Sequence, residues 1–215
     1  MTILFDMDGT LIDSTPAILE SFDAAFKKTG INFPDLEKIP PLIGYPLDII
    51  FVKLGVQTDK TDEFVAAYKA HYKTVATKKT TLINGAKEAV EEAYKFARLG
   101  IVTTKTSLYT KEILQHFNLL EFFKVVVGRE DVTHAKPHPE PVLKALLELK
   151  SGTKDAWMIG DTILDLTAAK EAKINSVGVL CGYGKKEDLI KLTDNITENT
   201  LQAVTLIKNN LSKTF

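Results

Sequence analysis

The chain has 215 residues, of which 45% are hydrophobic and 26% are charged, as in an ordinary globular protein with one large domain or a core domain carrying a smaller insertion. Its formal net charge of −1 gives no indication of nucleic acid or an anionic membrane as a partner, and no apolar run approaches the roughly 20 residues that span a bilayer. The single cysteine, Cys181, and a first segment without the basic and apolar regions of a signal peptide predict a cytoplasmic protein.

Five short apolar runs, each followed by polar residues or glycine, are predicted to be strands. In chain order they are residues 3–5, 99–102, 125–127, 157–159 and 177–180. Helical periodicity fills the gaps between the last four runs, over residues 110–117, 140–149 and 164–172. Strands that alternate with helices indicate an α/β fold with a doubly wound parallel sheet. The strands of such a sheet end at one common edge, where ligands bind.

The stretch between the first strand and Gly85 interrupts this alternation, because it contains no strand-like run. Residues 16–28, 47–54 and 62–74 are predicted to be helices, and the links between them contain Pro34, Pro40, Pro41 and Pro46. We therefore expect residues 14–81 to form a small helical cap domain. It would be inserted in an α/β core domain of residues 1–13 and 82–215, and would stand over the edge where the strands end.

Two carboxylates directly follow the first predicted strand, in the run Asp6-Met7-Asp8-Gly9-Thr10. Acids two residues apart at a strand end can point the same way, and glycine permits a tight turn beside a ligand. The alternative is a capped turn that leads into a helix. The other strand ends favour the first interpretation, because they too carry polar side chains suited to a ligand.

Three further signals lie at or after later strands. A hydroxyl at a strand end, such as Thr103 or Thr104, can bind a phosphate oxygen, although such a pair is more often a turn or a helix cap. Lys136 precedes a proline that restricts the backbone, so it could be held in place rather than solvated. Asp161 and Asp165 would share one face of a helix that begins there, with helix capping by Asp161 as the alternative. Carboxylates from two strand ends suit Mg²⁺, and a lysine with a hydroxyl suits phosphate.

Together these signals resemble the phosphatase branch of the haloacid dehalogenase superfamily. The resemblance rests on DMDGT at 6–10, the strand-end threonine at 103, the lysine before proline at 136 and GDTxxD at 160–165. It covers essentially the whole chain, and the helical insertion resembles the type 1 cap of that superfamily. Three runs are most similar to phosphoglycolate-phosphatase-like members, namely IGYPL at 43–47, KPHP at 136–139 and GYG at 182–184.

The resemblance implies a reaction in two steps. Asp6 would be the nucleophile and form an aspartyl-phosphate. Asp8 would protonate the leaving oxygen and then activate the water that cleaves this intermediate. Mg²⁺ would lie between Asp6, the backbone carbonyl of Asp8 and Asp161. Asp165 would orient a water on the metal without being a ligand itself.

The resemblance also implies a set of phosphate contacts. Thr103 and Lys136 would hold the oxygens of the transferring phosphoryl group, aided by backbone N–H groups near Gly9 and Thr104. Thr104 stands where asparagine is common in similar sequences, which would alter one contact near the phosphate.

The cap would close over the phosphate and read the rest of the substrate. Gly44 and Tyr45 lie in a predicted loop between cap helices and are the expected substrate contacts, although Tyr45 could equally well pack between the helices. The expected substrate is a small phosphorylated metabolite, with 2-phosphoglycolate first. A β-phosphoglucomutase-like phosphomutase and an inorganic pyrophosphatase remain alternatives, and both a monomer and a homodimer remain open.

Overall fold

The computed structural model describes residues 1–31 and 35–211, so Pro34, one of the prolines predicted to separate helices, lies outside the described residues. At its centre is a six-stranded sheet in the order β5-β4-β1-β6-β7-β8, whose neighbouring strands all run parallel. This sheet confirms the predicted doubly wound α/β fold, and all five predicted strands lie in it. Its strands are β1 (Thr2–Phe5), β4 (Arg98–Val102), β5 (Phe123–Val127), β6 (Ala156–Gly160), β7 (Asn175–Val179) and β8 (Ile196–Thr197).

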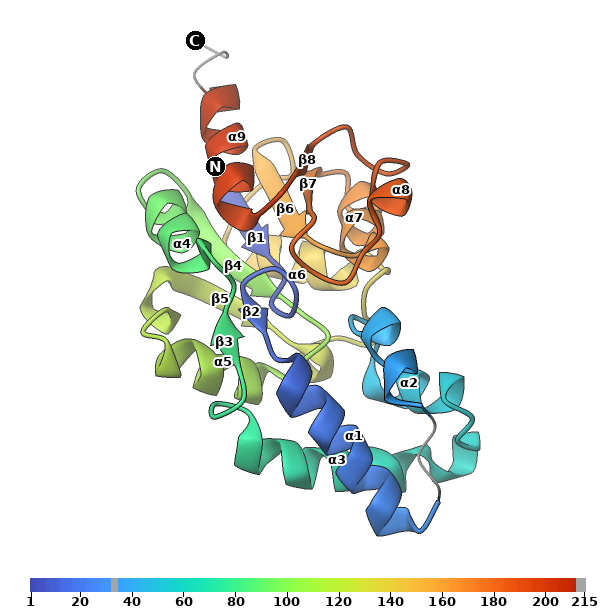
Figure 1. The fold of residues 1–215 in the computed structure, drawn as a ribbon. Coiled ribbons are helices and arrows are strands. Elements are labelled where there is room, and N and C mark those ends of the chain that lie inside the picture. Colours follow the sequence, from blue (N-terminus) through green and yellow to red (C-terminus); the bar gives the residue numbers. More distant parts are fainter. Residues whose placement is uncertain (32–34, 212–215) are drawn as a thin grey trace.

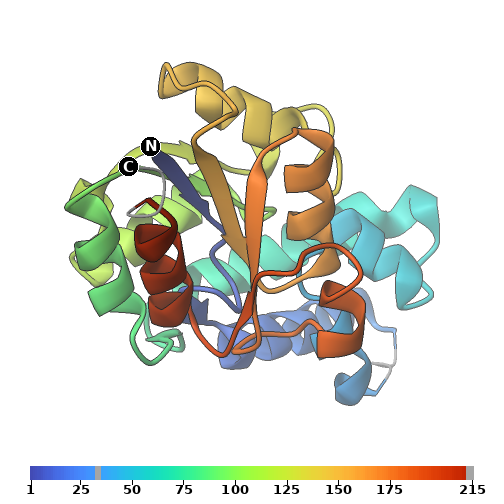
Figure 2. The same ribbon diagram turned by 90° about the horizontal axis from the view of Figure 1, so that it is seen from above.

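Helices cover both faces of the sheet (Figure 2). Successive residues of β1 point to opposite faces, so Ile3 and Phe5 belong to one apolar core and Leu4 to the other. The first core takes buried residues of α4 (Ala86–Tyr94), α5 (Ser107–His116) and α9 (Thr200–Leu211). The second takes those of α6 (Glu140–Glu148) and α7 (Ile163–Glu171). This burial on both sides explains why the strands are continuous apolar runs rather than alternating ones.

The remaining elements of the core are short and were not predicted. They are β8, α8 (Lys186–Leu189) and the 3₁₀ turns η4 (Leu120–Phe122) and η5 (Arg129–Asp131). Across residues 1–31 and 35–211, no helix is both long and apolar enough to cross a bilayer.

Three longer helices lie between β2 (Ile12–Asp13) and β3 (Thr81–Leu82), which form a separate antiparallel pair. They correspond to the helices predicted in the insertion, and they lie beyond the edge at which β1 ends (Figure 1). The division into core and cap domains at 13/14 and 81/82 stays a prediction, and the β2–β3 pair places Asp13 opposite Thr81. The elements of this segment are α1 (Thr15–Thr29), η1 (Leu36–Lys38), η2 (Pro40–Leu42), α2 (Leu47–Lys53), η3 (Thr58–Lys60) and α3 (Thr61–Val75).

Aromatic rings hold these three helices together. Phe51 of α2 lies 4.9 Å from Phe22 and 5.9 Å from Phe26, both of α1, measured between ring centroids. It also lies 5.3 Å from Phe64 of α3. All four rings are almost completely buried. The inserted helices therefore have an aromatic core of their own, and they pack as a unit opposite the edge of the sheet.

Candidate active site

Four charged side chains meet at the edge where β1 and β6 end. Asp6 follows β1 and Asp161 follows β6, and because these strands are parallel neighbours, their ends lie side by side. Asp165 comes from the first turn of α7, and Lys136 from the loop before α6. Taken as whole residues, all four are between 0% and 4% exposed. Carboxylate oxygens of Asp6, Asp161 and Asp165 lie within 4.8 Å of one another, close enough for these groups to share a cation.

Lys136 is the cation within this buried group. Its ammonium donates to Asp6 Oδ1 at 2.6 Å, to Asp165 Oδ1 at 2.5 Å and to the carbonyl of Val102 at 2.9 Å. Burial alone would lower the pKa of Lys136, but the charges of Asp165 and Asp6 outweigh it and raise the pKa above its ordinary value. Lys136 therefore stays charged, with all three of its protons directed to fixed acceptors.

One lysine does not balance three carboxylates. The pKa of Asp6 is raised from 3.8 to about 7, because burial and the charge of Asp165 disfavour its carboxylate against the opposing effect of Lys136. The pKa of Asp161 is raised well above its ordinary value by burial and by the charges of Asp165 and Asp6. The donor atoms are all oxygens, and the excess negative charge is buried. Both properties suit a hard divalent cation such as Mg²⁺, so the residues present fit the metal that the sequence predicts.

Asp161 is held by contacts from two distant segments. Thr10 Oγ1 donates to Asp161 Oδ1 at 3.0 Å, and the backbone N–H of Tyr183 donates to Oδ2 at 2.8 Å. A side-chain carbon at Gly9 would lie 2.3 Å from Asp161 Oδ2, and one at Gly182 would lie 2.1 Å from the same atom. Both positions therefore need glycine. The run GYG at 182–184 contributes the N–H donor of Tyr183 and, at Gly182, the room that the Asp161 carboxylate occupies.

The relation between Asp161 and Asp165 differs from the predicted one. Because α7 begins at Ile163, Asp161 precedes the helix, and the two acids do not share a helical face. The cap is Thr162, whose backbone N–H and hydroxyl donate to Asp165 Oδ2 at 2.9 and 2.6 Å. Asp165 thus accepts at Oδ2 from the start of α7 and at Oδ1 from Lys136. Whether it orients a water on a metal stays a prediction.

The carboxylate of Asp8 makes its contacts outside the group of three buried aspartates. It accepts a hydrogen bond from Ser14 Oγ, and its Oδ2 lies 3.1 Å from the ammonium of Lys105. Its side chain is 12% exposed, more than that of Asp6 at 6%. Asp8 therefore stands between the buried group and the inserted helices. The roles predicted for its side chain and for its backbone carbonyl remain predictions.

Lys105 is a site residue that the sequence reasoning missed. Its side chain is only 8% exposed, and besides the ion pair with Asp8 it donates to Tyr72 Oη of α3 at 2.8 Å. Burial would lower the pKa of Lys105, but the charge of Asp8 and the hydroxyl of Tyr72 outweigh it and raise the pKa above its ordinary value. The only local signal was the position directly after Thr103 and Thr104, and a lysine after a turn is usually solvated.

The predicted phosphate and substrate contacts fall in two places. Thr103 is buried at the end of β4, and its Oγ1 accepts the backbone N–H of Lys105 at 3.1 Å. Thr104 Oγ1 donates to the carbonyl of Gly44 at 2.9 Å, so two predicted contacts bind each other across the junction with the inserted segment. Gly44, Tyr45 and Thr104 line a cavity of about 350 Å³ there. Tyr45 also carries the ammonium of Lys53 over its ring, 4.8 Å from the centroid.

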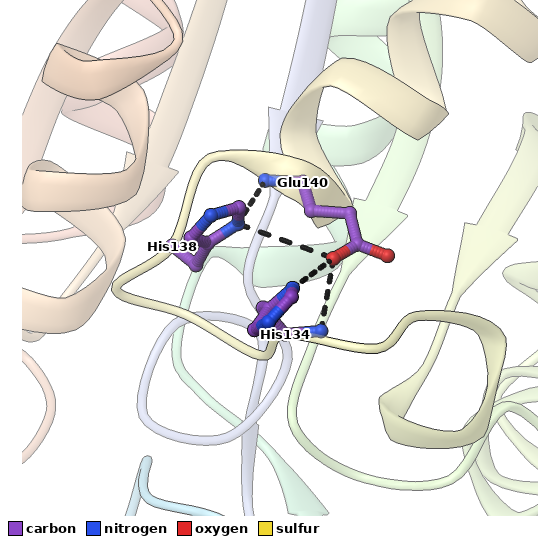
Figure 3. A group of neighbouring side chains, drawn as sticks. All are labelled: His134, His138 and Glu140. Atoms are coloured by element: carbon purple, nitrogen blue, oxygen red, sulfur yellow. Dashed lines mark hydrogen bonds and ion pairs between the residues drawn. The ribbon is translucent and has the colours of Figure 1, made fainter.

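The loop that carries Lys136 is fastened by a neighbouring acid (Figure 3). The carboxylate of Glu140 accepts the backbone N–H groups of Thr133 and His134 at 2.8 and 2.9 Å, and His134 Nδ1 at 2.9 Å. Its own backbone N–H donates to His138 Nδ1 at 3.2 Å. The ligand atoms of His134, His138 and Glu140 lie within 4.8 Å of one another, as in a metal site, but the carboxylate is already engaged by the backbone. We interpret the group as a clamp on the loop.

Comparisons with known proteins agree with this geometry. The family model of haloacid dehalogenase-like hydrolases matches residues 3–179. Pyrophosphatase PpaX of Anoxybacillus flavithermus is 36% identical over 192 residues, with 87% of each chain covered.

Solved structures share the whole fold. One, described as a predicted phosphatase from Clostridium acetobutylicum, has a TM-score of 0.87 at 26% identity, with 98% of both chains covered. Another, described as a predicted phosphoglycolate phosphatase from Haemophilus somnus, has a TM-score of 0.84 with 95% of this chain and 96% of the other covered, and its 23% identity supports the fold alone. As its motifs predict, the chain belongs to the haloacid dehalogenase-like hydrolases.

Proposed function

We propose that the protein is a Mg²⁺-dependent phosphatase of small phosphorylated compounds, with Asp6 as the nucleophile. The observation that carries this proposal is the buried contact of 2.6 Å between Asp6 and Lys136, beside the carboxylates of Asp161 and Asp165. An anionic nucleophile must approach an anionic phosphate, and this arrangement keeps one carboxylate fixed among groups that offset its charge.

The metal would be held by Asp6, Asp161 and the backbone carbonyl of Asp8, where its charge would favour the approach of one anion to another and stabilise the transition state. Asp165, which is tied to Lys136 and to the start of α7, keeps the lysine in place.

The chain's own residues account for the remaining chemistry. An oxygen of Asp6 forms a bond to phosphorus while the bond between phosphorus and the leaving oxygen breaks, and Asp8 gives that oxygen a proton. Asp8 then takes a proton from water as the water oxygen attacks phosphorus and the bond between phosphorus and the Asp6 oxygen breaks, which releases phosphate and restores the Asp6 carboxylate. Lys136 and Thr103 hold the phosphoryl oxygens during both steps, and the inserted helices restrict the access of water.

Two substrates are candidates for this site. 2-Phosphoglycolate is the substrate expected from the sequence motifs. Pyrophosphate is favoured by a separate observation, because the relative at 36% identity is named as a pyrophosphatase. No such observation favours the phosphomutase alternative.

Phosphate release from these two compounds and a hexose phosphate, measured with Mg²⁺ and with a chelator, tests the proposal. We expect Asp6→Asn to lower turnover at least about 1000-fold, because an amide is a far weaker nucleophile than a carboxylate. Asp155→Asn, at an exposed aspartate before β6, is the matched control. Normal turnover by Asp6→Asn, or turnover indifferent to the chelator, would contradict the proposal. Release that requires an added sugar bisphosphate would favour the mutase.

A further inference from the structure

The cavity between the sheet edge and the inserted helices adjoins the acid proposed to protonate the leaving oxygen. Asp8 is part of its lining, together with Tyr68 and Tyr72 of α3 and Lys105 of the core, whereas Asp6 is not. If Asp6 attacks the phosphorus and Asp8 serves the oxygen that leaves, the cavity lies on the side of the leaving group. Whatever part of the substrate departs with that oxygen must occupy this space.

Lys105 gives the cavity a buried positive charge. Its ammonium lies 3.1 Å from Asp8 Oδ2, donates to Tyr72 Oη at 2.8 Å and lies 4.5 Å from the centroid of the Tyr72 ring. An ammonium has three N–H donors, and these contacts use two of them. Among the residues that the structure describes, no third acceptor is present, so one donor of Lys105 remains for a ligand.

Two hydroxyl groups in the same lining also lack partners. Tyr68 is 5% exposed and stacks on Tyr72, yet within the described part of the chain its hydroxyl makes no hydrogen bond. Thr106 Oγ1 is buried without a hydrogen-bond partner. Buried polar groups are nearly always paired, so the buried Thr106 hydroxyl indicates a ligand that accepts from it. The Tyr68 hydroxyl, which is not fully buried, can donate to the same ligand.

Of the other charged groups of the lining, three acids are exposed, whereas the cations Lys69 and Arg129 are half-buried. Asp48, Asp62 and Glu130 are exposed, and Glu130 already accepts from the backbone and hydroxyl of Ser107. Solvent screens charges in such positions. Lys105 and Asp8 form the ion pair of the lining, with side chains only 8% and 12% exposed, and the half-buried Lys69 and Arg129 add to its positive charge.

We propose that this cavity is an anion subsite, in which Lys105 and the Tyr68 hydroxyl select substrates whose leaving part carries its own carboxylate or phosphate group. The inference rests on the proposed function, and it names the class of substrate: short phosphate esters or anhydrides with a second anionic group close to the leaving oxygen. Oxygens of that group accept from Lys105 and Tyr68, next to Asp8. A phosphate ester with a neutral leaving part leaves the buried ammonium without a new partner.

The test compares kcat/KM for pyrophosphate, 2-phosphoglycolate and phenyl phosphate, whose leaving part is neutral. We expect the wild-type enzyme to prefer pyrophosphate or 2-phosphoglycolate over phenyl phosphate. The better substrate of these two shows whether the subsite binds a phosphate or a carboxylate group. In Lys105→Met this preference ratio should fall by about 100-fold, since losing a charged partner of a substrate group costs that much or more. Tyr68→Phe should lower the ratio by roughly 10-fold.

Two controls separate selection from folding. Lys105→Arg keeps the charge and should retain most of the ratio, and Lys111→Met removes an exposed lysine of α5 and should leave it unchanged. An equal loss for all three substrates in Lys105→Met would overturn the subsite, as would a wild-type enzyme without preference for anionic leaving parts. A failure of the proposed function would look different, because phenyl phosphate would then show no turnover that depends on Asp6 and Mg²⁺.

Discussion

Gly182 leaves the space that the carboxylate of Asp161 occupies. A side-chain carbon added at residue 182 would lie 2.1 Å from Asp161 Oδ2, which is much shorter than a van der Waals contact. The same oxygen accepts the N–H of Tyr183, so the loop after β7 both limits and holds the acid. Small displacements of such a group matter, since a misplacement of about 1 Å can cost a hundredfold in rate.

We therefore expect Gly182→Ala to lower kcat by about 100-fold, because the new methyl group displaces Asp161 from the other carboxylates. Gly152→Ala is the control, since a side-chain carbon there would meet no atom within 4 Å. Steady-state kinetics of both variants, with their circular dichroism spectra, measure the effect. Unchanged kcat in Gly182→Ala would show that Asp161 need not hold its position.

The clamp formed by Glu140 should make stability depend on pH. The backbone N–H groups of Thr133 and His134 lower the pKa of Glu140 from 4.5 to about 2. A carboxyl whose pKa is lower in the folded state stabilises the fold above its unfolded pKa, and this contribution fades as the pH falls from 4.5 towards 2. Glu140→Gln should thus lower Tm more at pH 7 than at pH 3.

Thermal melts of the wild type, Glu140→Gln and Glu148→Gln at both pH values check this expectation. Glu148 is an exposed acid on the same helix, so it controls for the loss of charge from α6. A difference in Tm that is the same at pH 7 and pH 3 would contradict the clamp.

Much of the group of buried charged residues could be predicted from the sequence, because the position of each acid directly after a strand is visible there. Asp6 and Asp161 follow apolar strands, and parallel strands end at one edge, so their meeting follows from the fold class. Lys105 could not be found in this way. Its burial depends on Tyr72, which lies in another part of the chain and reaches it only through the packing of α3. The link between Thr104 and Gly44 depends on the same packing.

At the scale of elements, the inserted helices depend on aromatic contacts rather than on the sheet. Phe51 is completely buried and lies within about 6 Å of three other rings, whereas its neighbour Val52 is 42% exposed. The periodicity of α1, α2 and α3 was visible in the sequence because each helix has one buried face. The pair β2–β3 and strand β8 were not visible, because two residues are too few to show a pattern.

Phe51→Ala should lower the free energy of unfolding by about 3–5 kcal/mol, through lost burial and the cavity left behind. Val52→Ala should change it by no more than about 0.5 kcal/mol. Urea denaturation followed by far-UV circular dichroism compares the two variants. Equal effects of both would show that the aromatic core of α1–α3 does not hold these helices.

At the scale of the whole molecule, the buried carboxylates join segments that are far apart in the chain. Their mutual repulsion is present whenever no cation offsets it, so a metal that binds here should stabilise the folded protein. A hundredfold excess of Mg²⁺ over its Kd would contribute about 2.7 kcal/mol. Removing one of the three charges should likewise relieve part of the repulsion.

We expect Mg²⁺ to raise the Tm of the wild type and to have little effect on Asp161→Asn. With a chelator present, Asp161→Asn should melt at or above the wild-type temperature, because burial, and then the charges of Asp165 and Asp6, raise the pKa of Asp161 and make its charged form costly. Differential scanning calorimetry measures both differences. A wild-type Tm that does not respond to Mg²⁺ would remove the metal from this site.

The central place of β1 has a consequence for how the protein is made. This strand is synthesised before the other strands of the sheet, and both of its neighbours, β4 and β6, come much later. A nascent chain on the ribosome carries Asp6 before it carries Asp161, and the two acids cannot meet until β6 has emerged and docked. Contacts between such distant residues make folding slow. Catalytic competence should therefore return last when the denatured enzyme is refolded, after most helical signal has been regained.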